Sequence, residues 1–131
     1  MKKVYVGCSL THAPEAFRRE VERFKKRLKE IPDILVLEFL RLKDGTARAV
    51  YTHDIINCVG HCDLMIAICD HPSTGLGWEM GIQVSRGKPL LAFGHCDDNI
   101  TMLILDPGIP GYEFHRYQTF DEIYETVREK L

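Results

Sequence analysis

The segment "DHPSTGLGWEMG", residues 70–81, joins small residues, hydroxyl side chains and a glutamate directly after the apolar run "LMIAIC". Small residues let the backbone approach a ligand closely, and the free N–H groups at a helix start favour an anion such as phosphate. Ser73 and Thr74 add hydroxyl donors. We expect Glu79 about one turn into the following helix, where the helix dipole favours an ionised carboxylate. Such a carboxylate could act as a nucleophile or a base.

Three further residues accompany Glu79 at predicted strand ends. Tyr5 and Ser9 flank the end of the first predicted strand, and Asp54 lies on the helix before the third. Taken singly, Tyr5 reads as a core residue, Ser9 as a cap, Asp54 as a surface acid and Glu79 as a solvated partner of the helix dipole. Together they predict one polar crevice. The dinucleotide pattern G-x-G-x-x-G and the lysine of an NTP-binding loop do not occur in the segment 70–81.

These residues depend on an alternation of predicted strands and helices. Continuous apolar runs, which indicate strands covered on both faces, occur in two of the five predicted strands. The predicted strands are 3–9, 33–40, 63–70, 88–95 and 112–118, and the predicted helices are 14–29, 50–63, 77–87 and 119–131. Residues 41–50, with a turn signal at Asp44-Gly45, read mostly as a loop, and 99–108 as a short helix or turn. Thr11 could cap the first helix, and Thr119 with Glu122 predicts a capping box for the last.

Strand and helix alternate along the whole chain, which predicts an α/β protein with a parallel sheet. We expect a single doubly wound domain over residues 1–131, with five strands in the flavodoxin-like or Rossmann-like order 2-1-3-4-5 and helices on both faces. Ligands bind such sheets beyond the carboxyl ends of the strands, near the switch point between the first and third strands. The loops 7–12 and 70–77 meet there in the predicted fold.

The charge and hydropathy of the chain limit the classes of partner that we expect it to bind. The chain has 131 residues and a formal net charge of −2 at pH 7, so nothing favours a nucleic-acid or anionic-membrane partner. No apolar run is long enough to span a bilayer, and "MKKVYVGCSL" does not read as a signal peptide. We therefore predict a cytoplasmic protein whose partner is a small molecule.

The five cysteines predict reduced thiols rather than a disulfide framework, because no export signal is predicted. Cys58 and Cys62 have C-x3-C spacing, which is not usual for zinc, and no second C-x2-C pair completes four ligands. We predict no metal and no organic cofactor.

Four stretches, taken in order, resemble a known family: "VYVGCS", "HDIINCVGHCDLMIAI", "PSTGLGWEMG" and "GKPLLAF". They resemble the nucleoside 2-deoxyribosyltransferase superfamily over most of the chain, and are closest to its 2′-deoxynucleoside 5′-phosphate N-hydrolase branch. The resemblance implies that Glu79 attacks C1′ of a deoxyribosyl group. It further implies that Tyr5 holds and orients this carboxylate, and that Asp54 contacts the sugar or base and helps to protonate the departing base.

The resemblance also implies a substrate-binding set. Ser9 and Ser73 would bind the 5′ end of the substrate, beside the small residues Gly75 and Gly77. Thr101 falls near the position at which the family completes its site with a residue of a neighbouring subunit, so a homodimer or larger homo-oligomer is implied. The first loop, "GCSLTH", departs from the hydrolase branch because it lacks the arginine and glycines that follow the serine there.

The leading prediction is a retaining N-glycosidase that cleaves the base–deoxyribose bond of 2′-deoxynucleoside 5′-monophosphates through a covalent glycosyl-enzyme. Alternatives are a 2′-deoxyribosyltransferase that exchanges bases between nucleosides, a ribonucleotide hydrolase and a non-catalytic nucleotide sensor. The joint presence of Tyr5, Asp54 and Glu79 favours an enzyme over a sensor. Trp78, the only tryptophan, would either wall the sugar pocket or pack inside the helix layer.

Overall fold

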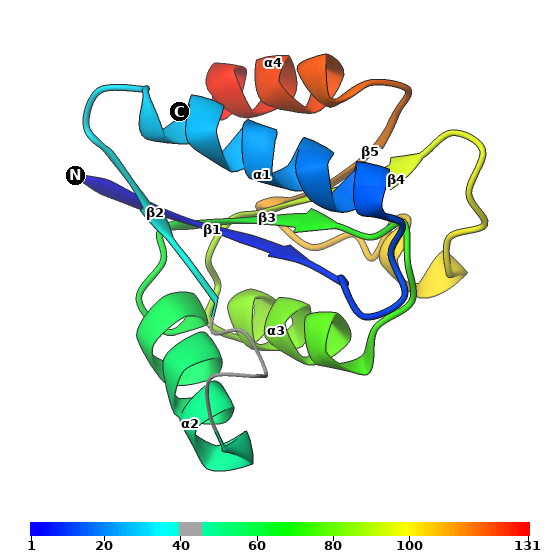
Figure 1. The fold of residues 1–131 in the computed structure, drawn as a ribbon. Helices are drawn as coiled ribbons and strands as arrows, with labels where there is room; N and C mark the ends of the chain where they lie inside the picture. Colours follow the sequence, from blue (N-terminus) through cyan, green and yellow to red (C-terminus); the bar gives the residue numbers. More distant parts are fainter. Residues whose placement is uncertain (40–45) are drawn as a thin grey trace.

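Five parallel strands form one sheet, as Figure 1 shows. The computed structural model describes residues 1–39 and 46–131. The strands are β1 (Lys2–Cys8), β2 (Ile34–Leu37), β3 (Leu64–Ile68), β4 (Leu90–His95) and β5 (Tyr112–Tyr117). Every neighbouring pair is parallel, and the order is β2-β1-β3-β4-β5. The predicted fold class and strand order are confirmed.

Helices cover both faces of the sheet, as the alternating sequence predicted (Figure 1). The helical segments are α1 (Glu15–Lys29), α2 (Ala47–Tyr51), η2 (Thr52–Val59, a π-helix), α3 (Thr74–Ser85), η3 (Met102–Ile104, a 3-10 helix) and α4 (Phe120–Lys130). Helices α1 and α4 lie on one face, whereas α2, η2 and α3 lie on the other. No helix in the described ranges is long and apolar enough to cross a membrane.

Successive side chains of a strand point to opposite faces, so each central strand supplies two cores. Val4 and Val6 of β1 pack into the core under α1 and α4. Tyr5, between them, packs instead into the core that contains residues of η2 and α3. This alternation places the Tyr5 hydroxyl on the α3 side of the sheet.

Two helices begin earlier than predicted. The segment 41–50 was predicted to be mostly loop, but its end forms α2, where the Thr46 hydroxyl caps the helix by accepting from the N–H of Ala49 at 3.2 Å. The predicted turn at Asp44-Gly45 lies outside the described residues. Helix α3 begins at Thr74 rather than at residue 77, because the Ser73 hydroxyl accepts from the N–H of Leu76 at 3.1 Å and caps it.

Of the two predicted helix caps, one is wrong and one is confirmed. The predicted cap of α1 by Thr11 is wrong, since Pro14 occupies the N-cap position without a side-chain hydrogen bond. The capping box of Thr119 and Glu122 is confirmed at the start of α4. All five cysteines are free thiols.

Candidate active site

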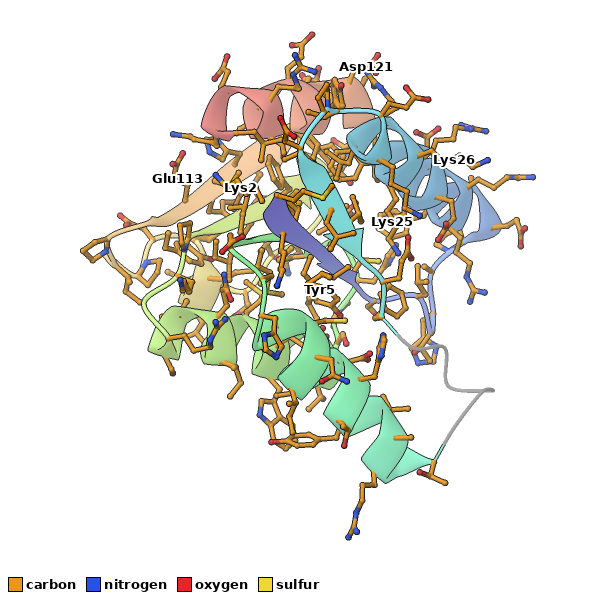
Figure 2. All side chains as sticks on the ribbon, turned by 90° about the vertical axis from the view of Figure 1, so that its left-hand side faces the viewer. Lys2, Tyr5, Lys25, Lys26, Glu113 and Asp121 are labelled. Atoms are coloured by element: carbon orange, nitrogen blue, oxygen red, sulfur yellow. The ribbon has the colours of Figure 1, made fainter. Side chains whose placement is uncertain are left out.

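Glu79 faces the interior rather than solvent. It is the sixth residue of α3, beyond the first turn, and its exposed fraction is only 9%. The Tyr5 hydroxyl donates a hydrogen bond to Glu79 Oε2, and Figure 2 shows Tyr5 on the side of β1 that faces the helices α2 and α3. The interpretation of Glu79 as a solvated partner of the helix dipole is therefore wrong, because the carboxylate is buried and bound to a side chain of the central sheet.

A glycine on β1 lies where α3 packs closely against the sheet. A Cβ atom at Gly7 would lie 2.9 Å from Leu76 Cδ1 and 3.1 Å from Met65 Cε, both too close for an ordinary contact. Gly7 follows Tyr5 by two residues on the same strand face, and Leu76 precedes Glu79 by about one helical turn. A larger residue at position 7 would therefore force the side chains of Leu76 and Met65 to shift.

A cavity of about 280 Å³ opens beside the Tyr5–Glu79 pair. Five of the predicted site residues line it together, and they come from β1, η2, α3 and the residue that caps α3: Tyr5, Asp54, Ser73, Gly75 and Glu79. The additional lining residues come from the end of β1, from the residues just after β2, and from α2, η2 and α3: Cys8, Phe39, Ala47, Val50, Tyr51, Ile55, Leu76 and Trp78. The structure thus brings together residues that lie up to 74 positions apart in the sequence.

The other three predicted binding residues lie elsewhere. Ser9 is buried just beyond β1 but is not among the described residues that line this cavity. Gly77 and Thr101 line a second cavity of about 150 Å³, and Ser73 lines both. Thr101 is exposed and caps the short helix η3, where its hydroxyl accepts from the N–H of Leu103 at 3.4 Å. Within one chain, therefore, Thr101 is separated from Glu79 by the start of α3.

The glycines of α3 leave space rather than form a turn. Gly75 and Gly77 are helical, and neither has a positive φ angle. A Cβ atom at Gly75 would meet only Ser73 Oγ, at 3.8 Å, and one at Gly77 would meet nothing within 4 Å. Each glycine costs the helix about 1 kcal/mol relative to alanine. A stability cost without a packing reason in the chain is typical of a site that needs room for a ligand.

Three influences together bring the pKa of the Glu79 carboxyl to about 7: burial raises it most, the hydrogen bond from Tyr5 lowers it, and the nearby charge of Asp54 raises it. Two carboxyl groups that share a cavity have different pKa values because both cannot ionise without repulsion. A pKa near 7 lets Glu79 be ionised in a substantial fraction of molecules at neutral pH. The ionised form is the one that can attack an electrophilic carbon.

Because the pKa of Glu79 is raised, the free energy of unfolding should depend on pH. Because the pKa of about 7 in the folded state exceeds the ordinary value of 4.5, the folded protein holds this proton more tightly than the unfolded chain. The penalty for ionising Glu79 is absent well below pH 4.5, grows as the pH rises to 7, and reaches roughly 3 kcal/mol above pH 7. We expect Glu79→Gln to raise the free energy of unfolding at pH 8 and to change it little near pH 4.5.

Urea unfolding of the two proteins at both pH values measures this difference. Glu129→Gln, an exposed substitution on α4, is the matched control and should have no effect at either pH. An equal gain from Glu79→Gln at both pH values would mean that packing, rather than ionisation, is responsible.

Cys8 also lines the cavity and is another potential nucleophile by residue type. Burial raises the pKa of the Cys8 thiol to about 12, despite the opposing influence of the Lys25 ammonium. The reactive form of cysteine is the thiolate, which is scarce at neutral pH under these conditions. Glu79 is therefore the better candidate for a nucleophile in this cavity.

Helices α2 and η2 form one wall of the cavity. The lining residues Ala47, Val50, Tyr51, Asp54 and Ile55 follow the i, i+3, i+4, i+7, i+8 spacing of one helix face. Only the part of this wall from residue 50 onward lies in the helix predicted over 50–63, because the turn signal in the preceding segment favours a loop. The helical spacing that begins at Ala47 is nevertheless visible in the sequence.

Within residues 1–39 and 46–131, no three His, Cys, Asp or Glu side chains are grouped so that they could hold a metal ion. The cavity instead offers a buried carboxylate, a second acid and a hydroxyl group beside a helix start. These groups suit nucleophilic attack on a small polar substrate, with a subsite for an anionic group.

Comparison with known sequences identifies related proteins. A family model described as nucleoside 2-deoxyribosyltransferase matches residues 4–122. A curated relative from Syntrophotalea carbinolica, named "Putative 2'-deoxynucleoside 5'-phosphate N-hydrolase 1", is 28% identical over 83 residues. The match covers 63% of this chain and 58% of that relative, which is less than two thirds of the relative's length.

Solved structures with the same fold include the CMP N-glycosidase of Clostridium botulinum. It superposes with a TM-score of 0.78 at 20% identity, covering 99% of this chain and 100% of the other. A conserved protein of Enterococcus faecalis superposes with a TM-score of 0.61 at 18% identity, covering 100% of this chain and 99% of the other. At this level of identity the two structures support the fold alone.

Proposed function

The chain belongs to the nucleoside 2-deoxyribosyltransferase family, and we propose that it is an N-glycosidase of 2′-deoxynucleoside 5′-monophosphates, formed by residues 1–131 as a single domain. The observation that carries the proposal is the buried Glu79 carboxylate, which accepts a hydrogen bond from Tyr5 inside a cavity that also contains Asp54. The name of the Syntrophotalea relative supports the choice of a nucleotide as the substrate.

The proposed reaction has two displacements at C1′ of the sugar. A Glu79 oxygen attacks C1′, the bond from C1′ to the base nitrogen breaks, and its electron pair leaves with the base. Asp54, which lines the same cavity, delivers the proton that neutralises the departing base. Water then attacks C1′ of the glycosyl ester and gives up a proton to Asp54, which yields 2-deoxyribose 5-phosphate, returns the Glu79 carboxylate and restores the proton donor. Two inversions at C1′ retain the configuration.

Tyr5 is proposed to orient the nucleophile. Its hydroxyl binds Oε2 of Glu79, which leaves Oε1 to face the substrate. Burial, together with the negative charge of Glu79, raises the pKa of Tyr5 well above its usual range, so the phenol stays protonated and remains a donor. The hydrogen bond also favours the ionised form of Glu79.

The start of α3 is the proposed subsite for the 5′-phosphate. Ser73 Oγ accepts from the N–H of Leu76, so the hydroxyl hydrogen of Ser73 can be donated to a phosphate oxygen. Gly75, one turn from Glu79, presents no side chain into the cavity. Ser9, buried just beyond the end of β1, and Gly77, which lines the second cavity, complete the proposed binding set. The positive end of the α3 dipole adds to the attraction for an anion.

Thr101 is proposed to complete the phosphate subsite from a second copy of the chain in a homo-oligomer. Its exposed position on a loop outside the Glu79 cavity suits a contact between copies. We expect Thr101→Ala to raise KM for nucleotides by about tenfold and to leave KM for free nucleosides unchanged, because only nucleotides offer the charged acceptor. Steady-state kinetics on both substrate classes test this role. Equal effects on the two classes would remove Thr101 from the phosphate site.

Two related activities differ from the proposed one, the first in the group that accepts the sugar and the second in the sugar itself. If a second base captures the glycosyl ester faster than water does, the protein is a 2′-deoxyribosyltransferase, the activity that the family description names. If it accepts a sugar with a 2′-hydroxyl, it is a ribonucleotide hydrolase, and the Clostridium protein, a CMP N-glycosidase, is named for a ribonucleotide. A nucleotide sensor would bind the nucleotide and release nothing.

Chromatography of the products tests the proposal. The protein is incubated with each 2′-deoxynucleoside 5′-monophosphate, each free deoxynucleoside and each ribonucleoside 5′-monophosphate, with and without a second base. Free base from deoxynucleotides alone is the expected result. A new nucleoside that forms only with an added base would establish the transferase, and base from ribonucleotides would establish the ribonucleotide hydrolase. If no mixture yields a product, the proposal of an enzyme is contradicted and the hypothesis of a nucleotide sensor remains.

A further inference from the structure

Two aromatic side chains stand exposed at the cavity. The exposed fractions of Trp78 and Tyr51 are 58% and 44%, which is unusual for large rings, yet both line the cavity that contains Glu79. Their ring centroids are 6.0 Å apart, and their planes meet at 57°, so the rings do not stack on each other. Trp78 therefore does not pack inside the helix layer. Exposed apolar surface of this kind is typical of a ligand site.

Helix α2 presents its apolar face to the same space. Ala47, Val50 and Tyr51 lie on the face that lines the cavity, and α2 contains no buried residue. Its face is directly continuous with Asp54, which lies one turn beyond Tyr51. An apolar helix face that borders a catalytic acid is suited to a flat, apolar group whose edge is polar.

The lining of the cavity combines two kinds of chemistry. Ser73 and Gly75 supply a hydroxyl group and open backbone at the start of α3. Tyr51 and Trp78 supply aromatic surface at the side facing α2. Glu79, adjacent to Trp78 in the chain, lies within the same cavity as both groups. A nucleotide combines matching groups, since its sugar, which carries C1′, bears both an anionic phosphate and a flat aromatic base.

We propose that Tyr51 and Trp78 form the nucleobase subsite, in which the leaving base lies against the aromatic rings while its edge faces Asp54. This inference rests on the proposed function, because it assigns the part of the substrate that leaves. Stacking is tolerant of base identity, since every base has an aromatic face. The two rings therefore favour any nucleobase over a group without an aromatic face. Contacts between Asp54 and the polar edge of the base would then discriminate among bases.

The only tryptophan of the chain reports directly on this subsite. Glu79→Gln is titrated with a 2′-deoxynucleoside 5′-monophosphate and, separately, with 2-deoxyribose 5-phosphate, which lacks the base. We expect the nucleotide to quench the fluorescence of Trp78, and the sugar phosphate to leave it nearly unchanged. Equal quenching by the two ligands, or none by a nucleotide that calorimetry shows to be bound, would overturn the inference.

Variants test the energetic contribution of each ring. In the otherwise unaltered protein we expect Trp78→Ala and Tyr51→Ala each to raise KM for nucleotides by about tenfold, whereas Trp78→Phe and Tyr51→Phe retain most of the affinity. The dissociation constant of 2-deoxyribose 5-phosphate should not change. Ile56→Ala is the matched control, because Ile56 is 49% exposed on η2 and is not among the lining residues. A KM within twofold of the parent in both alanine variants would overturn the inference.

Two further outcomes separate a nucleobase subsite from an interface between copies and from a failure of the proposed reaction. A change in oligomeric mass by light scattering in Trp78→Ala, together with an unchanged KM, would assign the ring to an interface and overturn the inference. Absence of base release by the unaltered protein would count against the proposed function alone. The titration of Glu79→Gln would still decide whether a base lies on Trp78.

Discussion

Glu79→Gln is expected to lower the rate of base release by at least about 10³-fold while leaving nucleotide binding intact. Glutamine has nearly the same shape as glutamate, and its amide oxygen can still accept the hydrogen bond that Tyr5 donates to Glu79. It has no ionised oxygen to attack C1′. The effect should therefore appear in kcat, measured by chromatography of the released base, while the dissociation constant measured by calorimetry stays within a few-fold.

A covalent intermediate gives this prediction a second readout. When the unaltered protein is mixed with substrate and quenched in acid, the peptide that contains Glu79 should carry the mass of a 2-deoxyribose 5-phosphate group. The same peptide from Glu79→Gln should not carry it. Glu129→Gln, exposed on α4, controls for removal of a charge and should retain full activity. Turnover by Glu79→Gln at the parental rate would remove Glu79 from the mechanism.

Asp54→Asn is expected to reduce kcat by about 10²–10⁴-fold for natural bases, because asparagine cannot donate the proton that the departing base requires. A substrate whose base leaves without protonation, such as a 7-methylated purine nucleotide, should lose much less. The ratio of the two kcat losses is the measurement. Asp106→Asn, an exposed substitution, is the control and should affect neither substrate.

The same variant should shift the pH at which Glu79 ionises in the unliganded protein. Burial, and then the negative charge of Asp54, raise the pKa of Glu79 to about 7. Because asparagine removes that charge, the Glu79 carboxyl should ionise at lower pH, which an NMR titration of its side-chain carboxyl carbon measures. An equal loss of kcat for both substrates, with no shift in this titration, would mean that Asp54 serves folding rather than proton transfer.

The architecture was predictable because it follows from patterns of neighbouring residues. Continuous apolar runs such as "LMIAIC" identify strands that helices cover on both faces, and their alternation with helical segments leaves few topologies. The alternation of side chains along β1 likewise follows from the order Val4, Tyr5, Val6. The candidate residues Tyr5, Asp54 and Glu79 were predictable from their places near strand ends, and the cavity contains all three.

Other predictions failed at the starts of helices, where capping side chains set the boundary. Residues 47–49 belong to a helix although the turn signal before them favours a loop, and α3 starts at Thr74 rather than at residue 77. The earlier start of α3 turns Gly75 from a loop residue into a helical one. Ser73 borders both cavities, whereas Gly77 and Thr101 border only the second.

Local sequence is therefore enough to predict the strand order and the kinds of side chain that meet at the sheet edge, because strand and helix periodicities are properties of neighbouring residues. The burial and ionisation of Glu79, in contrast, cannot be predicted from neighbouring residues. Its burial, its hydrogen bond to Tyr5 and its pKa of about 7 depend on β1, η2 and α3 packing together across the sheet. Desolvation and Coulombic interaction act through space, so only the packed chain determines whether this glutamate is a surface acid or a nucleophile.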